Sequence, residues 1–450
     1  MRRQTVMAIL LSVTWVVIAV FSSETEQAKA GPNPIWGTPS PVSTSAVAFA
    51  GNPQMKQDGL GNLHLAFVYC ANGWCPLFYS KRDTNGVWGP LESPPGQTTM
   101  SGRYSDGLLV SSDGTVHVFW ADQHGGVNTG FHYVQRSPTG IWGEPEEHPY
   151  IGSTLLSDER NGYLYVVGDT FAVRAPDGTW TTEPVPGYVY SFAISPGGQQ
   201  YLLYGSYDNL ILATRQSGDA WSVGEYITST PARLDTAKFV LDDSGNPRVI
   251  WREFAPYECF PFTCDGFSLH YREANGGIWS AQEDLALLKG NNYPFITSDV
   301  AVADDGTRYV MWSSDEEVNG QPTVFVSRRN GGADWTPPSV FPGFGVKLLT
   351  ENGTIHAFWK VQGYTLNHWI AYSREGYWSY AGFAANSFDV SMTFDVEPDV
   401  DGSGRLHLFW PDRSDTFRMM YRSWDAANVP TSVPTATATV PVPTATPIPQ

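Results

Sequence analysis

One short pattern recurs along the whole chain and limits what it can fold into. It consists of a glycine, two further residues, a His or Tyr, two apolar residues and an aromatic residue, as in GTVHVFW at 114–120. Eight copies, some imperfect, begin at Gly61, Gly114, Gly162, Gly198, Gly245, Gly306, Gly353 and Gly404. Each copy is a turn that leads into an apolar, aromatic-rich run of strand length. Such a run is buried on both faces only when strands of the same kind surround it.

Further strands follow in most copies. A second strand often ends in Tyr and Arg, as in LHYR at 269–272, and a tight turn then leads to a Trp. These turn tryptophans are Trp88, Trp142, Trp180, Trp221, Trp279, Trp335 and Trp378. One more short apolar strand precedes the next repeat glycine. Four strands in each repeat match a propeller blade, so the sequence predicts an all-β fold, a β-propeller of four-stranded antiparallel blades.

The two ends of the chain predict how the ring closes. The last copy ends near Trp424 without a turn tryptophan, whereas an unmatched Ile35-Trp36-Gly37 stands near the N-terminus. We expect the N-terminal strand to complete the last blade, which removes open sheet edges. This gives eight blades. Seven is the alternative, if the short third copy between Gly162 and Gly198 is not a full blade.

Composition divides the chain into three parts. Residues 1–30 have two arginines before an apolar run and an Ala-Lys-Ala site, which is typical of a secretory signal peptide. Residues 31–428 form the single propeller domain, and 429–450 are a Thr/Pro-rich linker or stalk. No later segment has the ~20 apolar residues of a membrane span. We therefore expect a secreted protein, extracellular or at the cell surface, with no membrane span in the mature chain.

The charge balance argues against one class of partner. The net charge is −18, and removal of the signal makes it about −19. No run of Lys and Arg offsets this charge, so nucleic acid is excluded as a partner. No pattern in the sequence indicates a cofactor, and we expect a monomer.

Four cysteines form two close pairs, Cys70 with Cys75 and Cys259 with Cys264. In an exported protein, this spacing favours two local disulfides. A zinc site that uses all four thiolates is the alternative, and it requires the two pairs to meet in space.

The repeat histidines are His64, His117, His356 and His407. Equivalent residues of a ring lie in different blades and do not converge, so we expect hydrogen bonds between blades and no metal site. The repeat aromatics are expected to pack between blades, with sugar stacking as the alternative. Residues 399–404 resemble a calcium loop only weakly and also suit an ordinary turn.

The repeats resemble the sialidase-like, Asp-box (BNR) group of β-propellers over residues 35 to 424. The resemblance rests on the Asp/Ser-Gly turn before His-x-x-Trp and on the hairpin that leads to Gly-x-Trp. The family's turn reads Ser-x-Asp-x-Gly-x-x-Thr/Trp, and Ser80, Asp83, Gly86 and Trp88 match it with altered spacing. The resemblance implies the propeller fold. It also implies a sialidase-type site, with three arginines on a substrate carboxylate, a Tyr nucleophile assisted by Glu, and an Asp acid/base.

Candidate site residues lie where the innermost strands begin and where the loops after the repeat aromatics start, because both converge on one mouth of the ring. The candidate ligand-binding residues are Arg103, Tyr104, Asp106, Arg233, Asp235, Arg252, Glu253, Asp299, Asp412 and Arg413. The arginines suit a carboxylate, because their planar fork forms two parallel hydrogen bonds. The family's Phe/Tyr-Arg-Ile/Leu-Pro motif, which places the first arginine, is absent, so no catalytic residue is assigned.

Three functions follow from these features. The first is a non-catalytic exported propeller that binds an extracellular glycan or another macromolecule, such as a protein ligand, through the mouth loops. The second is an exo-acting glycoside hydrolase of the sialidase-like type. The third is a structural or adhesive surface protein. Three of Arg103, Arg233, Arg252 and Arg413 pointing at one spot would favour the hydrolase.

Overall fold

The computed structural model describes most of the central part of the chain as strands and turns. The described residues are 40–42, 49–70, 76–97, 106–124, 127–148, 156–206, 208–228, 233–255, 257–259, 262–264, 266–289, 297–318, 321–351, 354–362, 368–374, 383–387, 397–401, 403, 405–412 and 418–425. The predicted secretory signal and stalk lie outside these residues. No helix within them is long and apolar enough to cross a membrane.

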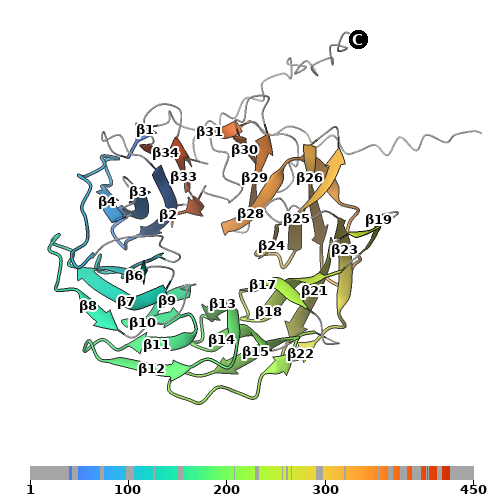
Figure 1. Cartoon of the computed structure of the whole chain (residues 1–450), viewed down its shortest axis with the longest axis horizontal. Coiled ribbons are helices and arrows are strands. Elements are labelled where there is room, and N and C mark those ends of the chain that lie inside the picture. The colour runs from blue at the N-terminus through green and yellow to red at the C-terminus, as the bar shows by residue number, and fades with distance from the viewer. Residues whose placement is uncertain are drawn as a thin grey trace, which may run out of the picture.

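The described strands form antiparallel sheets arranged in a ring, which confirms the predicted all-β propeller (Figure 1). The innermost strands are β2 (Phe49–Gln57), β5 (Asp106–Val110), β9 (Leu156–Arg160), β13 (Tyr188–Ile194), β17 (Leu234–Leu241), β24 (Ser298–Val302), β28 (Phe344–Glu351) and β32 (Glu397–Val400). The second strands are β3 (Leu63–Cys70), β6 (Val116–His124), β10 (Tyr163–Val167), β14 (Gln200–Ser206), β18 (Pro247–Phe254), β25 (Arg308–Val318), β29 (Thr354–Gln362) and β33 (Arg405–Asp412). Each second strand begins just after a repeat glycine.

The third strands carry the Tyr-Arg segments. They are β4 (Leu77–Arg82), β7 (Val127–Arg136), β11 (Thr170–Arg174), β15 (Asn209–Arg215), β21 (Gly266–Asn275), β26 (Gln321–Arg329), β30 (His368–Arg374) and β34 (Arg418–Asp425). The outer strands are β8 (Glu146–His148), β12 (Trp180–Pro184), β16 (Glu225–Tyr226), β22 (Ile278–Trp279), β23 (Glu283–Lys289), β27 (Ser339–Pro342) and β31 (Phe383–Ser387), with β1 (Ser40–Pro41) in the last sheet. A separate hairpin pairs β19 (Tyr257–Cys259) with β20 (Phe262–Cys264).

The innermost strands of neighbouring sheets contact each other all the way round the ring, from β2 to β32 and back to β2. Seven of these sheets have four or five described strands each. Seven is also the alternative number of blades that the sequence predicts. The sheet of β2, β3 and β4 has three strands, extended by single bridges from Tyr79 to Glu92 and from Arg82 to Trp88. The short third copy, in contrast, forms a complete four-stranded sheet. We number the sheets from first to eighth in the order of the repeat glycines.

The N-terminal part of the chain completes the last sheet, as predicted. Strand β1 pairs with β34, with Ser40 opposite Tyr421 and Pro41 opposite Met420, and the Val42 nitrogen donates to the Met419 oxygen at 2.8 Å. The expected Ile35-Trp36-Gly37 strand lies outside the described residues. The ring is therefore closed by hydrogen bonds between the two ends of the chain.

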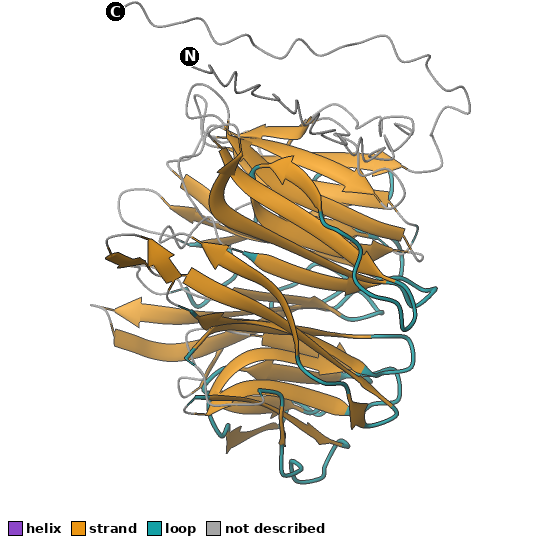
Figure 2. Ribbon diagram, turned by 90° about the vertical axis from the view of Figure 1, so that its right-hand side faces the viewer, coloured by secondary structure: helices purple, strands orange, loops and turns teal. Residues whose placement is uncertain are grey.

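The tight turns gather on one face of the ring, where they are drawn in teal in Figure 2. The repeat glycines among the described residues adopt a positive φ in these turns, 87° at Gly114, which explains why the pattern begins with glycine. We call this side the turn face. The opposite side is the mouth, where innermost strands begin and second strands end.

The repeat histidines His64, His117 and His407 form hydrogen bonds within their own sheets, so the prediction of bonds between blades was wrong for these three. His64 contacts the Tyr79 hydroxyl at 2.7 Å on the adjacent strand and Asp58 at 3.1 Å in the preceding turn. His407 repeats this arrangement with Tyr421 and Asp401. The histidine follows the turn directly, so its nearest polar groups are those of the turn and of the next strand. These contacts tie each turn to its own sheet.

The repeat aromatics pack between sheets, as predicted. Trp120 of the second sheet is fully buried in a cluster with Val68 and Leu77 of the first sheet. Trp251 and Trp359 occupy equivalent clusters at two other interfaces. Truncation of such a side chain to alanine costs about 3–5 kcal/mol, so these contacts contribute strongly to the stability of the ring.

A polar contact recurs between neighbouring sheets, and we call it the inter-sheet latch. In the first interface, Glu92 of the first sheet accepts a hydrogen bond from Trp142 Nε1 at 2.7 Å and pairs with Arg136 at 2.6 Å, both of the second sheet. The Trp142 ring meets Tyr79 of the first sheet edge to face, and the Arg136 guanidinium lies over the Tyr79 ring. Equivalent tryptophan bonds reach Glu146, Glu183, Glu225 and Glu283. Each of these glutamates joins two sheets.

Candidate functional site

The predicted mouth residues are described to different extents. Arg103, Tyr104 and Arg413 lie outside the described residues. Asp106 begins β5 opposite Trp120, and Asp412 ends β33 opposite Arg418. For these five residues the site assignment remains a prediction.

Four other candidates lie together at the mouth end of the fifth sheet. Arg233 precedes β17, Asp235 lies on β17, and Arg252 and Glu253 end β18. Leu234 pairs with Glu253 but Thr236 pairs with Arg252, so Asp235 is the extra residue of a β-bulge. Bulges redirect a side chain next to the ladder, and here the bulge places Asp235 beside Arg252.

Two arginines of this group are held by different contacts. Arg252 Nη2 lies 2.6 Å from Asp235 Oδ2, and both side chains are largely buried. The Arg252 guanidinium also lies 5.4 Å from the centre of the Phe267 ring. Arg233 is exposed and stacks over Phe254 at 4.1 Å. Arg233 is therefore the arginine of this pair that is accessible to solvent.

A chain of polar contacts continues across the same sheet. Trp251 Nε1 donates to Glu253 Oε1 at 2.7 Å, and His270 Nε2 lies 3.5 Å from Glu253 Oε2. The other ring nitrogen of His270 lies 2.8 Å from Asp284 Oδ1 on β23. The side chain of Asp284 is 80% exposed, whereas that of His270 is 7% exposed. These contacts thus connect the buried indole of Trp251 with the solvent-exposed carboxylate of Asp284.

We call Asp235, Trp251, Arg252, Glu253, His270 and Asp284 the fifth-sheet group. The imidazole of His270 lies between two carboxylates and stacks on Trp251 at 5.3 Å. A ligand hydroxyl could donate to Glu253 or Asp284, and a ligand carboxylate could pair with Arg233. The sheet therefore offers an exposed donor in Arg233 and an exposed acceptor in Asp284, whereas the ring of Trp251 is buried.

The sequence analysis did not include His270 and Asp284 among the candidates. A signal for the histidine was present, because His132 and His270 both stand directly before the repeat tyrosine of a third strand. His132 stacks on Trp120 at 5.3 Å, as His270 stacks on Trp251. No sequence signal marks Asp284, because its contact depends on the pairing of β21 with β23.

Asp299 lies apart from the fifth-sheet group. It is 3% exposed on β24, accepts a hydrogen bond from Lys238 of β17, and accepts another from the Leu348 nitrogen of β28 at 2.8 Å. Asp299 thus joins the innermost strands of three successive sheets. These contacts explain its burial without a ligand.

The two disulfides stay a prediction. Cys70 ends β3, and Cys75 lies outside the described residues. Cys259 and Cys264 lie on the paired strands β19 and β20, opposite Phe262 and Tyr257. Within the described part of the chain, no group of three or more His, Cys, Asp or Glu is placed to hold a metal ion.

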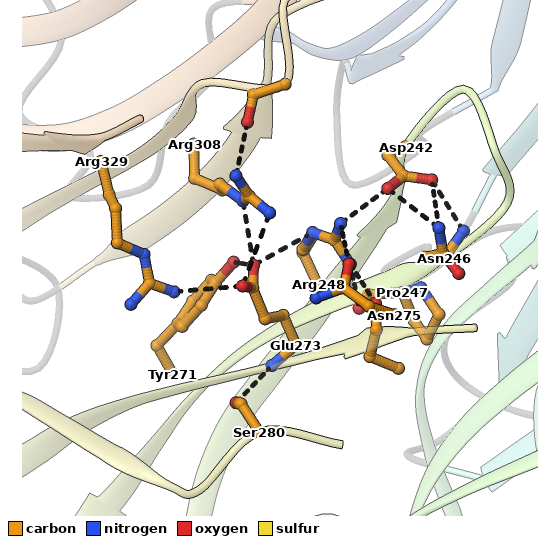
Figure 3. A network of polar contacts seen from close by, with 12 residues as sticks. Asp242, Asn246, Pro247, Arg248, Tyr271, Glu273, Asn275, Ser280, Arg308 and Arg329 are labelled. Carbon is orange, nitrogen blue, oxygen red and sulfur yellow. Dashed lines mark hydrogen bonds and ion pairs between the residues drawn. The ribbon is translucent and has the colours of Figure 1, made fainter. Parts of the chain in front are cut away.

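Three arginines do converge, but none of them is a predicted one. Arg248, Arg308 and Arg329 surround Glu273, and the Tyr271 hydroxyl donates to the same carboxylate at 2.8 Å (Figure 3). Arg308 Nε is 2.9 Å from Glu273 and Arg248 Nε is 3.2 Å away. The cluster lies toward the turn face, at the interface of the fifth and sixth sheets. Its carboxylate belongs to the protein, so the arginines hold the two sheets together.

The clearest cavities also lie toward the turn face. A cavity of about 450 Å³ lies between the third and fourth sheets beside Glu183 and Arg215. Another of about 430 Å³ lies between the fourth and fifth sheets beside Glu225 and Trp279. These polar side chains already bind each other across the interface. The cavities therefore follow from the latches, and the fifth-sheet group remains the candidate site.

Comparison with known proteins gives a fold-level likeness only. No family model matches the chain, and no curated protein matches it. Among solved structures, the polysaccharide lyase Uly1 has a TM-score of 0.46 at 11% identity over 89% of this chain and 94% of that one. A polysaccharide lyase of a new family, an ulvan lyase bound to -[GlcA(1-4)Rha3S]-, has a TM-score of 0.45 at 11% identity, with 91% and 99% covered. An alpha-L-arabinanase from Penicillium chrysogenum, complexed with arabinobiose, has a TM-score of 0.41 at 11% identity, with 88% and 100% covered.

Proposed function

We propose that this chain is an exported β-propeller that binds an extracellular glycan at its mouth, without catalysis. The observation that supports the proposal is the fifth-sheet group, in which carboxylates, a guanidinium and an imidazole lie beside aromatic rings. Sugar hydroxyls both donate and accept hydrogen bonds. A rigid sheet that presents charged donors and acceptors to solvent suits such a ligand, and the buried rings of Trp251 and Phe267 support these side chains.

The division of the group into buried and exposed members fits this role. Arg252 and Asp235 neutralise each other, and the pair holds the bulge in place. Arg233 and Asp284 reach solvent at the edges of the same sheet. In the proposal, these exposed side chains contact the glycan, and the buried pair positions them.

The test is a glycan array probed with the purified mature chain and with Arg233→Ala and Asp284→Asn. Both variants remove one polar contact and leave the Arg252–Asp235 pair intact. We expect each to weaken the strongest glycan signals at least about tenfold, which corresponds to ~1.4 kcal/mol. The matched control is Arg328→Ala, which removes an exposed arginine near the turn face. Array profiles of both mouth variants that equal the wild-type profile would rule out this face.

A fluorogenic sialoside assay, run beside the array, separates binding from hydrolysis. The proposal predicts no turnover by the wild-type chain. Turnover that disappears in Glu253→Gln would instead support the sialidase-like hydrolase, because that type of site uses a Glu to assist its Tyr nucleophile. Binding without turnover supports the proposal.

A further inference from the structure

In the described part of the interface that closes the ring, the donors of an inter-sheet latch are present, but no glutamate binds them. Trp88 of the first sheet meets Tyr421 of the eighth sheet edge to face at 5.4 Å, and the Arg82 guanidinium lies 4.8 Å from the centre of the same ring. The equivalent distances around Tyr79 in the first interface are 5.5 Å for Trp142 and 5.1 Å for Arg136. The two interfaces therefore place the same three side chains in the same way.

The position of the missing carboxylate is fixed by the strand register. Glu146 is opposite Tyr133 and Glu283 is opposite Tyr271, whereas Ser40 is opposite Tyr421. The sequence shows the same correspondence, because Ser40 stands four residues after Trp36, as Glu146 stands four residues after Trp142. Serine is too short to reach the donors that a glutamate reaches at the other interfaces.

The two donors are left without a partner. Trp88 Nε1 and Arg82 Nε are buried atoms that form no hydrogen bond. No ion pair joins the Arg82 side chain to any described carboxylate. A buried donor that loses its partner costs about 1–3 kcal/mol, so this interface would gain from an acceptor.

A turn glycine holds the Arg82 guanidinium in place although its Nε has no hydrogen-bond partner. A Cβ added at Gly86 would lie 2.7 Å from Arg82 Nη2, and one added at Gly140 would lie 3.0 Å from Arg136 Nη2. In both turns the guanidinium packs closely on the glycine. The Arg82 fork is therefore as well positioned as the one that binds Glu92.

We propose that Arg82 and Trp88 form a carboxylate-binding site at the ring closure. The ligand is a small carboxylate that takes the place of the glutamate side chain, with one oxygen on the indole N–H and the other on the guanidinium. Ser40, Arg82 and Trp88 are each partly exposed, so the site borders solvent. This site lies in a different interface from the fifth-sheet group and is independent of glycan binding at the mouth.

The test uses the mature chain and acetate as the probe. Acetate replaces chloride at constant ionic strength, while the thermal unfolding midpoint and the Trp88 indole N–H resonance are followed. We expect a saturable rise of about 1–3 °C in the midpoint for a chain of this length, together with a saturable shift of that one resonance. No saturable change in either quantity would overturn the proposal, as would an equal effect of phosphate.

Variants at Ser40 provide the matched comparison. Ser40→Glu should raise the midpoint without acetate, shift the Trp88 resonance in the same direction and abolish the response to acetate. Ser40→Gln has the same length without the charge and should give a smaller rise. Trp88→Phe should remove the acetate response in a folded protein, which keeps the test valid if Ser40→Glu fails to fold. A full acetate response in either Ser40→Glu or Trp88→Phe would contradict the site.

Discussion

The fifth–sixth interface and the interface that closes the ring each pack a tyrosine, a tryptophan and an arginine together in the same way. Among the described residues, only the fifth–sixth interface supplies a carboxylate to the tryptophan and the arginine. Glu283 binds Trp335 at 2.9 Å and Arg329 at 2.7 Å. Glu273 adds contacts with two further arginines, Arg248 and Arg308 (Figure 3). At the closing interface, Ser40 leaves Trp88 without a hydrogen bond. The aromatic packing alone is thus sufficient to join two sheets, and the carboxylate adds to it.

The closing interface also differs from the others in how the polypeptide connects its two sheets. Most neighbouring sheets are joined by a covalent connection as well as by packing, whereas the first and eighth sheets meet through the short strand β1. A strand of two residues provides few ladder bonds. An added acceptor would therefore increase the stability of the closing interface.

The largest expected effect on stability comes from removing the Glu273 carboxylate at the fifth–sixth interface. Glu273→Ala leaves three buried arginines without their shared carboxylate, so we expect a loss of about 3–5 kcal/mol in the free energy of unfolding. Urea denaturation of the variant and the wild type measures this loss. The control is Asp177→Asn in an exposed turn, with an expected change within about 0.5 kcal/mol. Equal losses for the two variants would show that the cluster does not join the sheets.

A second prediction compares two buried repeat histidines that have different polar neighbours. His64 has a carboxylate neighbour, Asp58, but His117 has the Ser111 hydroxyl at 3.0 Å. Burial lowers the pKa of His117 from its ordinary 6.5 to about 4, and the charge of Arg174 acts in the same direction. Between pH 6.5 and 4 the unfolded chain binds a proton that the folded chain does not, so stability falls as the pH falls.

The expected size is about 2–3 kcal/mol between pH 7 and 4.5, at ~1.36 kcal/mol for each pH unit below 6.5. His117→Gln keeps a hydrogen-bonding group but cannot titrate, so its stability should fall by that much less over the same range. Urea denaturation at several pH values gives both curves. Parallel curves for the two proteins would refute the assignment to His117.

The smallest effect tests the closing interface directly. In a buffer free of carboxylates, Trp335→Phe loses a hydrogen bond to Glu283 and should cost about 1–2 kcal/mol. Trp88→Phe removes a donor that has no partner, so it should change stability by less than about 0.5 kcal/mol beyond its packing cost. The two variants make the same change in equivalent packing. A similar loss for both would mean that Trp88 has an acceptor.

The fold was predictable because its signals are local. Turn glycines, apolar strands and the turn tryptophans recur along the chain, and they predicted the sheets, the ring closure and the packing of Trp120. The latch glutamates were also within reach, since Glu92, Glu146, Glu225 and Glu283 each stand four residues after a turn tryptophan. The histidine contacts were predicted wrongly, because residue spacing does not show whether a polar group meets its own sheet or the next one.

The candidate site was predictable only in part. Chain direction placed Arg233, Asp235, Arg252 and Glu253 at the mouth, and the structure brings these four together. It separates Asp299 from them, because Lys238 and the Leu348 nitrogen bind that carboxylate between innermost strands. His270 and Asp284 joined the group through strand register, which no single segment reveals.

The sequence by itself determined the all-β repeat, the order of the strands and the use of both chain ends in one sheet, because these depend on patterns a few residues long. The tertiary structure decided which charges meet. Glu273 contacts Arg308 and Arg329, and Asp235 contacts Arg252, whereas the Trp88 indole N–H has no hydrogen-bond acceptor. Each of these contacts joins residues from different strands, and its energy depends on distance and burial that only the assembled ring fixes.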